Sequence, residues 1–146
     1  MILVDANIFI YAHDLKSPFH TGARRWVEQA FSDSEPVRLS WTGLLAFLRI
    51  TTHARVFENP FSLDEALQVV EYWLSQPCMG LLQPGQRHTA ILTSLLRQTQ
   101  ATGPLIMDAH LAALAIEHGA VLYTTDSDFA QFPGLRSINP LVLQPT

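Results

Sequence analysis

Two aspartates of this sequence directly follow short apolar runs that are typical of buried strands. Asp5 comes after Ile2-Leu3-Val4, and Asp126 comes just after a run that begins at Val121. The carboxyl ends of parallel strands meet at one edge of a sheet, so both carboxylates are expected at that edge. Two carboxylates that lie close together repel each other unless a positive charge separates them. A divalent cation that prefers oxygen ligands, Mg²⁺ or else Mn²⁺, is the simplest such charge.

Two further aspartates, Asp108 and Asp128, extend this candidate metal site. Asp128 follows Asp126 by two residues, and Asp108 lies in the first turn of a predicted helix. The four carboxylates converge only if the fold brings this helix start to the same edge, which the residues alone leave open. Each carboxylate also has an ordinary alternative role at a helix start, as a cap or as a partner of the helix dipole. The combination nevertheless favours a catalytic metal site at Asp5, Asp108 and Asp126, with Asp128 as a further ligand.

Asn7 lies two residues beyond Asp5, where its amide is expected to orient the Asp5 carboxylate or a metal-bound water. The alternative is an ordinary asparagine at a helix start. No cysteine or histidine spacing resembles a zinc site, because the six histidines are scattered. Cys78 is the only cysteine and has no partner for an internal disulfide, so a cytoplasmic location is the default expectation.

The rest of the chain alternates between strand-like and helix-like patterns. Such alternation predicts an α/β fold of three layers, in which helices cover both faces of a mainly parallel central sheet. Strands are expected at residues 2–4, 36–40, 79–82 and 121–124, with a last one that begins at Ile138. Helices are expected from Ala6 to about His13, from Ser17 onward, from Trp41 to about His53, from Ser62 onward, from Pro84 to about Gln100, and from Ile106 to His118.

Length and composition fit a single domain that spans residues 1–146. The net charge of −4 argues weakly against a broad basic surface for nucleic acid, but it does not exclude an acidic site that holds a metal ion. No apolar run approaches the roughly 20 residues of a membrane helix, and the amino terminus does not resemble a signal peptide. The apolar residues Trp26, Phe31, Phe57 and Trp73 exceed the needs of one small core, so they are expected to form a surface for a homodimer or another protein partner.

Three short motifs resemble those of the PIN-domain family, and specifically its VapC-type toxins. They are residues 1–7 with Asp5 and Asn7, residues 107–115 with Asp108, and residues 122–129 with Asp126 and Asp128. The order and spacing agree over nearly the whole chain. The resemblance implies a parallel sheet between helices, with Asp5, Asp108 and Asp126 at one metal site and Asp128 in a supporting position.

The resemblance further implies endonucleolytic cleavage of RNA by a toxin whose partner is an antitoxin that wraps around it and blocks the site. Bound Mg²⁺ would activate water, and the carboxylates would hold the ion and accept a proton. The candidates for RNA contacts, by composition only, are Arg24, Arg25, Arg49 and Arg55. The alternative for each of them is a solvated position on the surface. Trp41 is expected to pack in the core rather than to stack on a base.

One position departs from the family pattern. Many members carry a glutamate in the helix after the second strand, three residues before an arginine, and here Ala46 holds that position before Arg49. Alanine ligates nothing, which argues against a second metal ion. The alternative function is therefore a weakened domain of the same fold that binds RNA or protein without cutting. A phosphatase with an aspartyl nucleophile is a more distant alternative, because Asn7 replaces the second acid that this chemistry usually needs.

Overall fold

A five-stranded sheet forms the centre of the computed structural model, which describes residues 1–141. Its order is β3-β2-β1-β4-β5, and every neighbouring pair of strands is parallel. The carboxyl ends of all strands therefore meet at one edge, and the predicted parallel sheet is confirmed. The strands are β1 (Ile2–Val4), β2 (Val37–Ser40), β3 (Met79–Leu82), β4 (Val121–Tyr123) and β5 (Ser137–Ile138).

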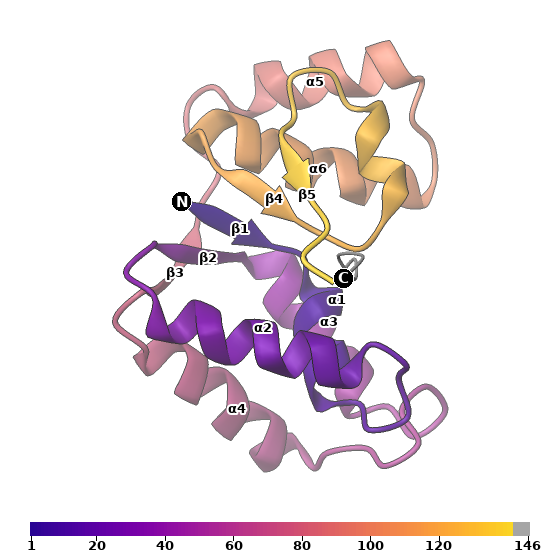
Figure 1. Cartoon of the computed structure of the whole chain (residues 1–146). Coiled ribbons are helices and arrows are strands. Elements are labelled where there is room, and N and C mark those ends of the chain that lie inside the picture. Colours follow the sequence, from indigo (N-terminus) through magenta and orange to yellow (C-terminus); the bar gives the residue numbers. More distant parts are fainter. Residues whose placement is uncertain (142–146) are drawn as a thin grey trace, which may run out of the picture.

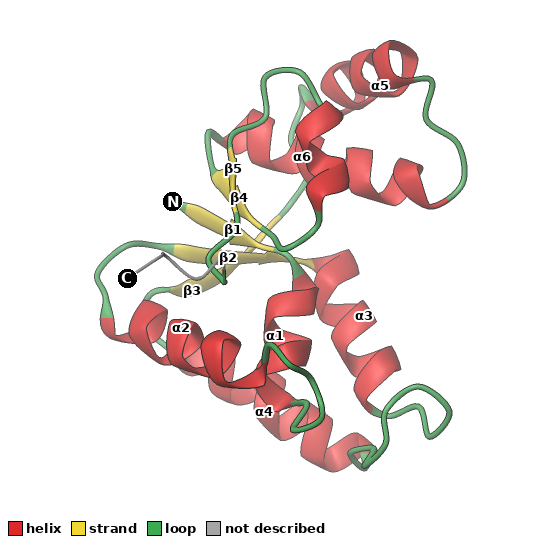
Figure 2. Ribbon diagram, turned by 45° about the vertical axis from the view of Figure 1, so that its right-hand side comes forward, coloured by secondary structure: helices red, strands yellow, loops and turns green. Residues whose placement is uncertain are grey.

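Helices cover both faces of this sheet, as Figures 1 and 2 show. The helices of one face are α1 (Ala6–His13), α2 (His20–Ser32), α3 (Trp41–Thr51) and α4 (Leu63–Ser75). Those of the other face are α5 (His88–Thr99), α6 (Pro104–His118) and a short 3₁₀ helix, η1 (Ser127–Gln131). This arrangement confirms the predicted three-layer α/β fold. No helix among the described residues has the length and apolar character that a membrane span needs.

The side chains of β1 alternate between two apolar cores. Ile2 and Val4 belong to the core beneath α1 to α4, whereas Leu3 belongs to the core beneath α5 and α6. Strands that are buried on both faces read as continuous apolar runs, which is why this segment was recognisable in the sequence. Because β1 is held from both sides, the position of Asp5 at its end is firmly set.

The aromatic residues that were expected to form a partner surface pack against the first core. Phe57 and Trp73 are buried, while Trp26 and Phe31 are half-buried against the same cluster. The ring centroids of Trp73 and Phe9 lie 4.3 Å apart. Four helices on one face of the sheet enclose a larger apolar volume than the sequence pattern suggested, and this accounts for the burial of these residues. Phe31 and Trp73 also line a surface groove, so their part in a partner surface stays a prediction.

Local capping signals explain where two of the helices begin. Ser62 and Glu65 form a capping box, since the Ser62 hydroxyl accepts from the Glu65 N–H at 3.1 Å and the Glu65 carboxylate accepts from the Ser62 N–H at 3.0 Å. α2 begins at His20 rather than at Ser17. The Ser17 hydroxyl accepts from the Phe19 N–H at 3.1 Å, which holds these residues in a turn before the helix.

α6 begins earlier than the sequence suggested, and this changes the position of Asp108. The helix starts at Pro104 rather than at Ile106, directly after Gly103 with a φ of +61°. Proline suits the first position of a helix, because the N–H that it lacks has no partner there. Asp108 therefore lies in the second turn of α6 and not in the first. Gly119 ends the helix in the left-handed conformation, directly after the predicted last residue His118.

Candidate metal centre

Hydrogen bonds between the ends of β1 and β4 fix the position of Asp5. The Asp5 N–H donates to the Tyr123 carbonyl at 2.9 Å, which continues the pairing one residue past β1. The Thr124 hydroxyl donates to Oδ2 of Asp5 at 2.8 Å, and its oxygen accepts from the Asp126 N–H at 3.0 Å. Thr124 thus ties Asp5 to the loop that carries Asp126.

Three other carboxylates converge at the same edge of the sheet. Asp108, Asp126 and Asp128 each offer an oxygen atom that lies within 4.8 Å of the other two. Oδ1 of Asp126 accepts from the Asp128 N–H at 2.8 Å, which fixes the loop before η1. Asp108 reaches this edge because the amino end of α6 points toward the region where β1 leads into α1 (Figure 2). Segments that are far apart in the sequence therefore deliver their carboxylates to one place.

The surroundings of Asp5 and Asp108 disfavour the charged form of both carboxyls. Burial raises the pKa of Asp5, and the charge of Asp126 adds to this effect, while the Thr124 hydroxyl and the nearby backbone N–H groups of Asn7 and Ala6 act in the opposite direction. The pKa of Asp108 is also raised, first by partial burial and then by the charges of Asp126, Asp5 and Asp128. The carboxylates therefore act on one another as one cluster of like charge.

The donor set fits a hard divalent cation. Within residues 1–141, none of Asp5, Asp108, Asp126 and Asp128 forms an ion pair with a basic side chain. All of the available donors are carboxylate oxygens, which Mg²⁺ and Mn²⁺ prefer, and no histidine or cysteine belongs to the group. Asp5 stands outside the tightest group, and with Oδ2 held by Thr124 it offers its other oxygen.

The repulsion within this cluster gives a testable effect on stability. A carboxyl whose pKa is higher in the folded than in the unfolded state stabilises the fold at low pH, and this contribution is lost as pH rises through the folded pKa. We therefore expect Asp108→Asn to raise the melting temperature of the metal-free protein at pH 7 by about 2 °C, a small value because solvent screens a half-exposed group. The gain should vanish near pH 4.

Thermal melts in EDTA at pH 4 and pH 7 measure this difference. Glu71→Gln is the matched control, because Glu71 is an exposed acid of α4 and belongs to no cluster of acids that could hold a metal ion in the described part of the chain. A lower melting temperature for Asp108→Asn at pH 7 in EDTA would contradict the proposed repulsion.

The model of the PIN domain family matches residues 2–135. The chain belongs to this family. One of its relatives, Ribonuclease VapC37 of Mycobacterium tuberculosis, is 39% identical over 143 residues, which cover 98% of this chain and 99% of the relative.

Solved structures show the same fold at low sequence identity. VapBC2 from Rickettsia felis, bound to a promoter DNA fragment, has a TM-score of 0.70 and 18% identity, with 95% of this chain and 98% of that chain covered. A toxin–antitoxin complex from Klebsiella pneumoniae has a TM-score of 0.63 and 17% identity, with 96% and 98% covered. These likenesses support the assignment of the fold.

The PIN domain brings together the four aspartates that the sequence indicated as a metal site. Asn7 interacts with Asp5 through its backbone, and not through its side-chain amide as had been expected. Its amide makes no hydrogen bond to Asp5 among the described residues, and it is the Asn7 backbone N–H that acts on the carboxylate. Orientation of a metal-bound water by the Asn7 amide stays a prediction. The role of Asp5, Asp108, Asp126 and Asp128 as metal ligands likewise stays a prediction, although their placement supports it.

Thr124 is the site residue that the sequence reasoning missed. Threonine next to an aspartate is common, and only the pairing of β4 with β1 brings its hydroxyl to Asp5. The only signal for this role in the sequence was a hydroxyl residue at the end of a predicted buried strand. Ser40 holds the equivalent place on β2, where its hydroxyl accepts from the Gly43 N–H at 2.9 Å and caps α3.

α3 carries Ala46, Arg49 and the aromatic residues whose burial or exposure was in question. Ala46 is half-buried there and offers no ligand. Trp41 was expected in the core, but it is 46% exposed, because it begins the helix directly after β2. Phe47, on the same helix, is buried. Arg49 is exposed and forms no ion pair within residues 1–141.

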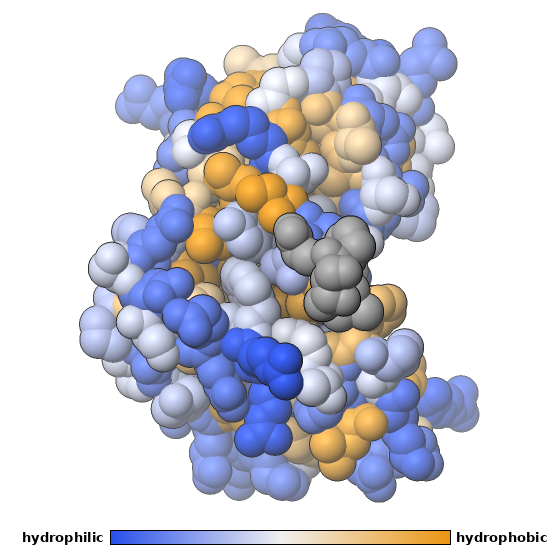
Figure 3. All heavy atoms as spheres, viewed as in Figure 1, coloured by the Kyte–Doolittle hydropathy of each residue, from blue (hydrophilic) through white to orange (hydrophobic). Residues whose placement is uncertain are grey.

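The remaining basic candidates lie in different parts of the PIN domain. Arg25 is exposed on α2, whose outer surface is mostly hydrophilic in Figure 3. Arg24 is paired with Glu28 at 3.2 Å. Arg55 is exposed in the segment between α3 and α4. A general surface role explains these positions, so none of them adds to the candidate metal centre.

Proposed function

We propose that this PIN domain is a metal-dependent endoribonuclease and the toxin of a toxin–antitoxin pair. The observation that carries the proposal is the convergence of Asp108, Asp126 and Asp128 beside Asp5 at the carboxyl edge of the sheet. The name of the relative Ribonuclease VapC37 supports the same activity. A nuclease that works on phosphodiesters needs charge relief on the phosphate, and this cluster is suited to hold the cation that provides it.

The residues of the site would have separate roles in metal binding, orientation and proton transfer. Asp108, Asp126 and Asp128 would hold Mg²⁺ or Mn²⁺ together with the free oxygen of Asp5. Such an ion lowers the pKa of bound water and polarises a phosphoryl oxygen. The Thr124 hydroxyl keeps Asp5 in one orientation, and a carboxylate of the cluster would accept the proton of the attacking water.

A weakened domain that binds without cutting is the second candidate. Its support is Ala46, which leaves the glutamate position of α3 without a carboxylate. The remaining acids still form a compact group, so we favour the nuclease with a single metal ion. The aspartyl phosphatase has no such support, since Asn7 and not an acid follows Asp5 by two residues.

An RNA cleavage assay tests the proposal. We expect structured and single-stranded RNA to be cut at internal positions in Mg²⁺ or Mn²⁺, and we expect cleavage to stop when EDTA is present. Cleavage that persists in EDTA would overturn the metal mechanism. Metal-dependent stabilisation without any cleavage would favour the binding domain instead.

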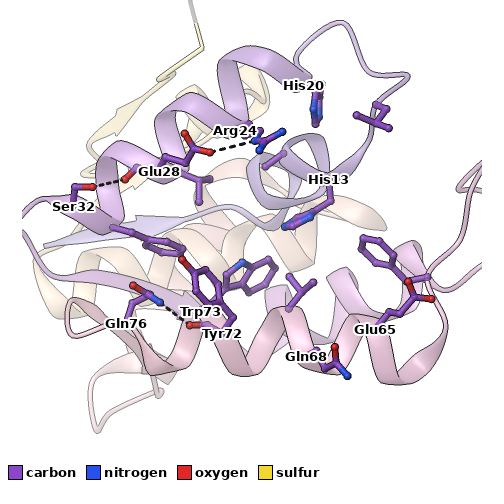
Figure 4. A pocket seen from close by; sticks show the side chains of 16 residues that line it. His13, His20, Arg24, Glu28, Ser32, Glu65, Gln68, Tyr72, Trp73 and Gln76 are labelled. Carbon is purple, nitrogen blue, oxygen red and sulfur yellow. Dashed lines mark hydrogen bonds and ion pairs between the residues drawn. The ribbon is translucent and has the colours of Figure 1, made fainter.

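A groove between α1, α2 and α4 supports an antitoxin as the protein partner (Figure 4). The groove has a volume of about 880 Å³, and it combines the aromatic side chains of Phe31, Tyr72 and Trp73 with charged groups such as Arg24 and Glu28. We propose that the antitoxin anchors here and covers the carboxylates with another segment. Growth arrest on expression, relieved by the product of a neighbouring small gene, would support this partner in the cytoplasm.

Exposed apolar side chains near the metal centre support a homodimer. Trp41 and Leu45 stand on α3, and Ile106 and Met107 stand in the first turns of α6, close to Asp108 in sequence. Such side chains near one edge are typical of a surface that a second copy covers. We expect light scattering to report a dimer for the wild type and a monomer for Leu45→Lys. A wild-type monomer at all concentrations would contradict this proposal.

A further inference from the structure

A small hollow opens beside Asp126, between the carboxyl ends of β4 and β5. Its volume is about 170 Å³, and it is lined by Thr124, Thr125, Asp126, Ser127, Ala130, Ser137, Ile138 and Asn139. One wall is the loop from β4 into η1, and the other wall is the end of β5. The two walls are held together because β4 and β5 pair in parallel and the Thr124 N–H donates to the Ile138 carbonyl at 3.0 Å.

Several polar groups of this hollow have no hydrogen-bond partner in the part of the chain that the structure describes. Within residues 1–141, the hydroxyls of Thr125, Ser127 and Ser137 make no hydrogen bond. Oδ1 of Asn139 accepts from the Leu141 N–H at 2.9 Å, which fixes the amide and leaves its NH₂ group as a donor. The hollow thus presents hydroxyls and one oriented amide donor.

The charge of the lining decides which chemical group fits. No lysine, arginine or histidine lines the hollow, and the negative Asp126 does, so a phosphate is disfavoured. Ile138 is 48% exposed and, with Ala130, adds apolar surface to the polar rim. A flat, uncharged group with hydrogen-bonding edges matches this combination, and an unstacked nucleobase is such a group.

We propose that this hollow binds the base of a nucleotide next to the scissile phosphate and sets the base preference of the enzyme. The inference rests on the proposed ribonuclease function. Asp126 connects the hollow with the candidate metal centre, because it lines the hollow and belongs to the carboxylate cluster. Because the hollow shares Asp126 with the cluster, a phosphate held at the cluster would place an adjoining nucleotide beside the hollow, whose far wall carries Ser137 and Asn139.

Asn139→Asp provides the sharpest test. The aspartate keeps an oxygen for the Leu141 N–H, but it replaces the amide donor with an acceptor. The probe is a pool of short RNA hairpins with a randomised loop, cut in Mn²⁺ and sequenced. We expect kcat/KM for the preferred base to fall about 10-fold and the preference to change at one position beside the cut. Ser137→Ala should lower it about 3-fold.

Asn59→Asp is the matched control, since it makes the same change in the exposed segment between α3 and α4, which contributes no residue to the hollow. A second arm uses the best-cleaved hairpin with an abasic nucleotide on either side of the cut. The wild type should cut one abasic substrate about 10-fold more slowly than the intact hairpin, and Asn139→Asp should cut the two alike.

The outcomes distinguish a failure of base binding in the hollow from a failure of the ribonuclease function. If the wild type cuts RNA and Asn139→Asp keeps the base preference of Asn59→Asp, the inference is wrong while the ribonuclease stands. If a 2′-deoxy substitution, and not the abasic one, removes the difference in cleavage rate between the wild type and Asn139→Asp, the hollow binds ribose and the inference is again wrong. If the wild type shows no metal-dependent cleavage of any RNA, the proposed function falls and the inference falls with it.

Discussion

Replacing Asp5 or Asp108 by asparagine is expected to lower kcat/KM for RNA cleavage in Mg²⁺ by at least about 1000-fold. Asparagine has nearly the same size, so the change removes charge and little else. Asp108 shares its site with Asp126 and Asp128, whose oxygens lie within 4.8 Å, and its loss would leave the cation with fewer charged ligands. Asp5 provides the remaining carboxylate and is held toward the site by Thr124.

Metal binding can be measured separately from cleavage. A cation that binds only the folded state raises the melting temperature, so Mn²⁺ should stabilise the wild type and have much less effect on either variant. Glu71→Gln serves again as the control and should cleave like the wild type. Full activity of both variants in Mg²⁺ would remove these aspartates from the mechanism.

Thr124→Val is expected to reduce cleavage about 10- to 100-fold, the range found when a partner of a metal ligand is removed. Thr124 is buried, and valine fills the same volume without the hydroxyl. The variant therefore loses the donor to Oδ2 of Asp5 and the acceptor for the Asp126 N–H. Because this hydroxyl lowers the pKa of Asp5, its loss should raise that pKa further and disfavour the charged carboxylate that a cation needs.

A matched substitution distinguishes a role in the site from a role in folding. Thr51 is also buried, and its hydroxyl donates to the Phe47 carbonyl at 2.8 Å within α3. Thr51→Val should therefore change stability and leave cleavage unchanged. Thr124→Ser keeps the hydroxyl and should recover most of the activity. Equal losses of activity in Thr51→Val and Thr124→Val would show that the effect is a general one on folding.

The sheet and most helices could be predicted because their signals are local. A short apolar run such as Ile2–Val4 reports a strand that is buried on both faces, and the capping box at Ser62 reports a helix start. Both signals depend on neighbouring residues only. The start of α2 was misplaced because the Ser17 hydroxyl forms a turn with Phe19, which competes with a helix start at the same residues.

Relations between distant segments were harder to predict. Asp108 could be placed at the carboxyl edge only through the resemblance to the PIN family, since the pattern of α6 does not say which way its amino end points. Thr124 was missed for the same reason, because its partner Asp5 is 119 residues away. Trp41 was assigned to the core because most tryptophans pack there, yet its place at the first position of α3 leaves it exposed.

The pairing of β1 with β4 also has a consequence during synthesis on the ribosome. β1 emerges well before its neighbour on one side, at Val121–Tyr123, because most of the described chain lies between them. Long-range contacts of this kind form late, because most of the chain must first be available to close the intervening loop. A nascent or truncated polypeptide that stops before Asp108 therefore lacks most of the acidic cluster, and a cell that makes the protein meets a complete site only after Asp128 has been added to the chain.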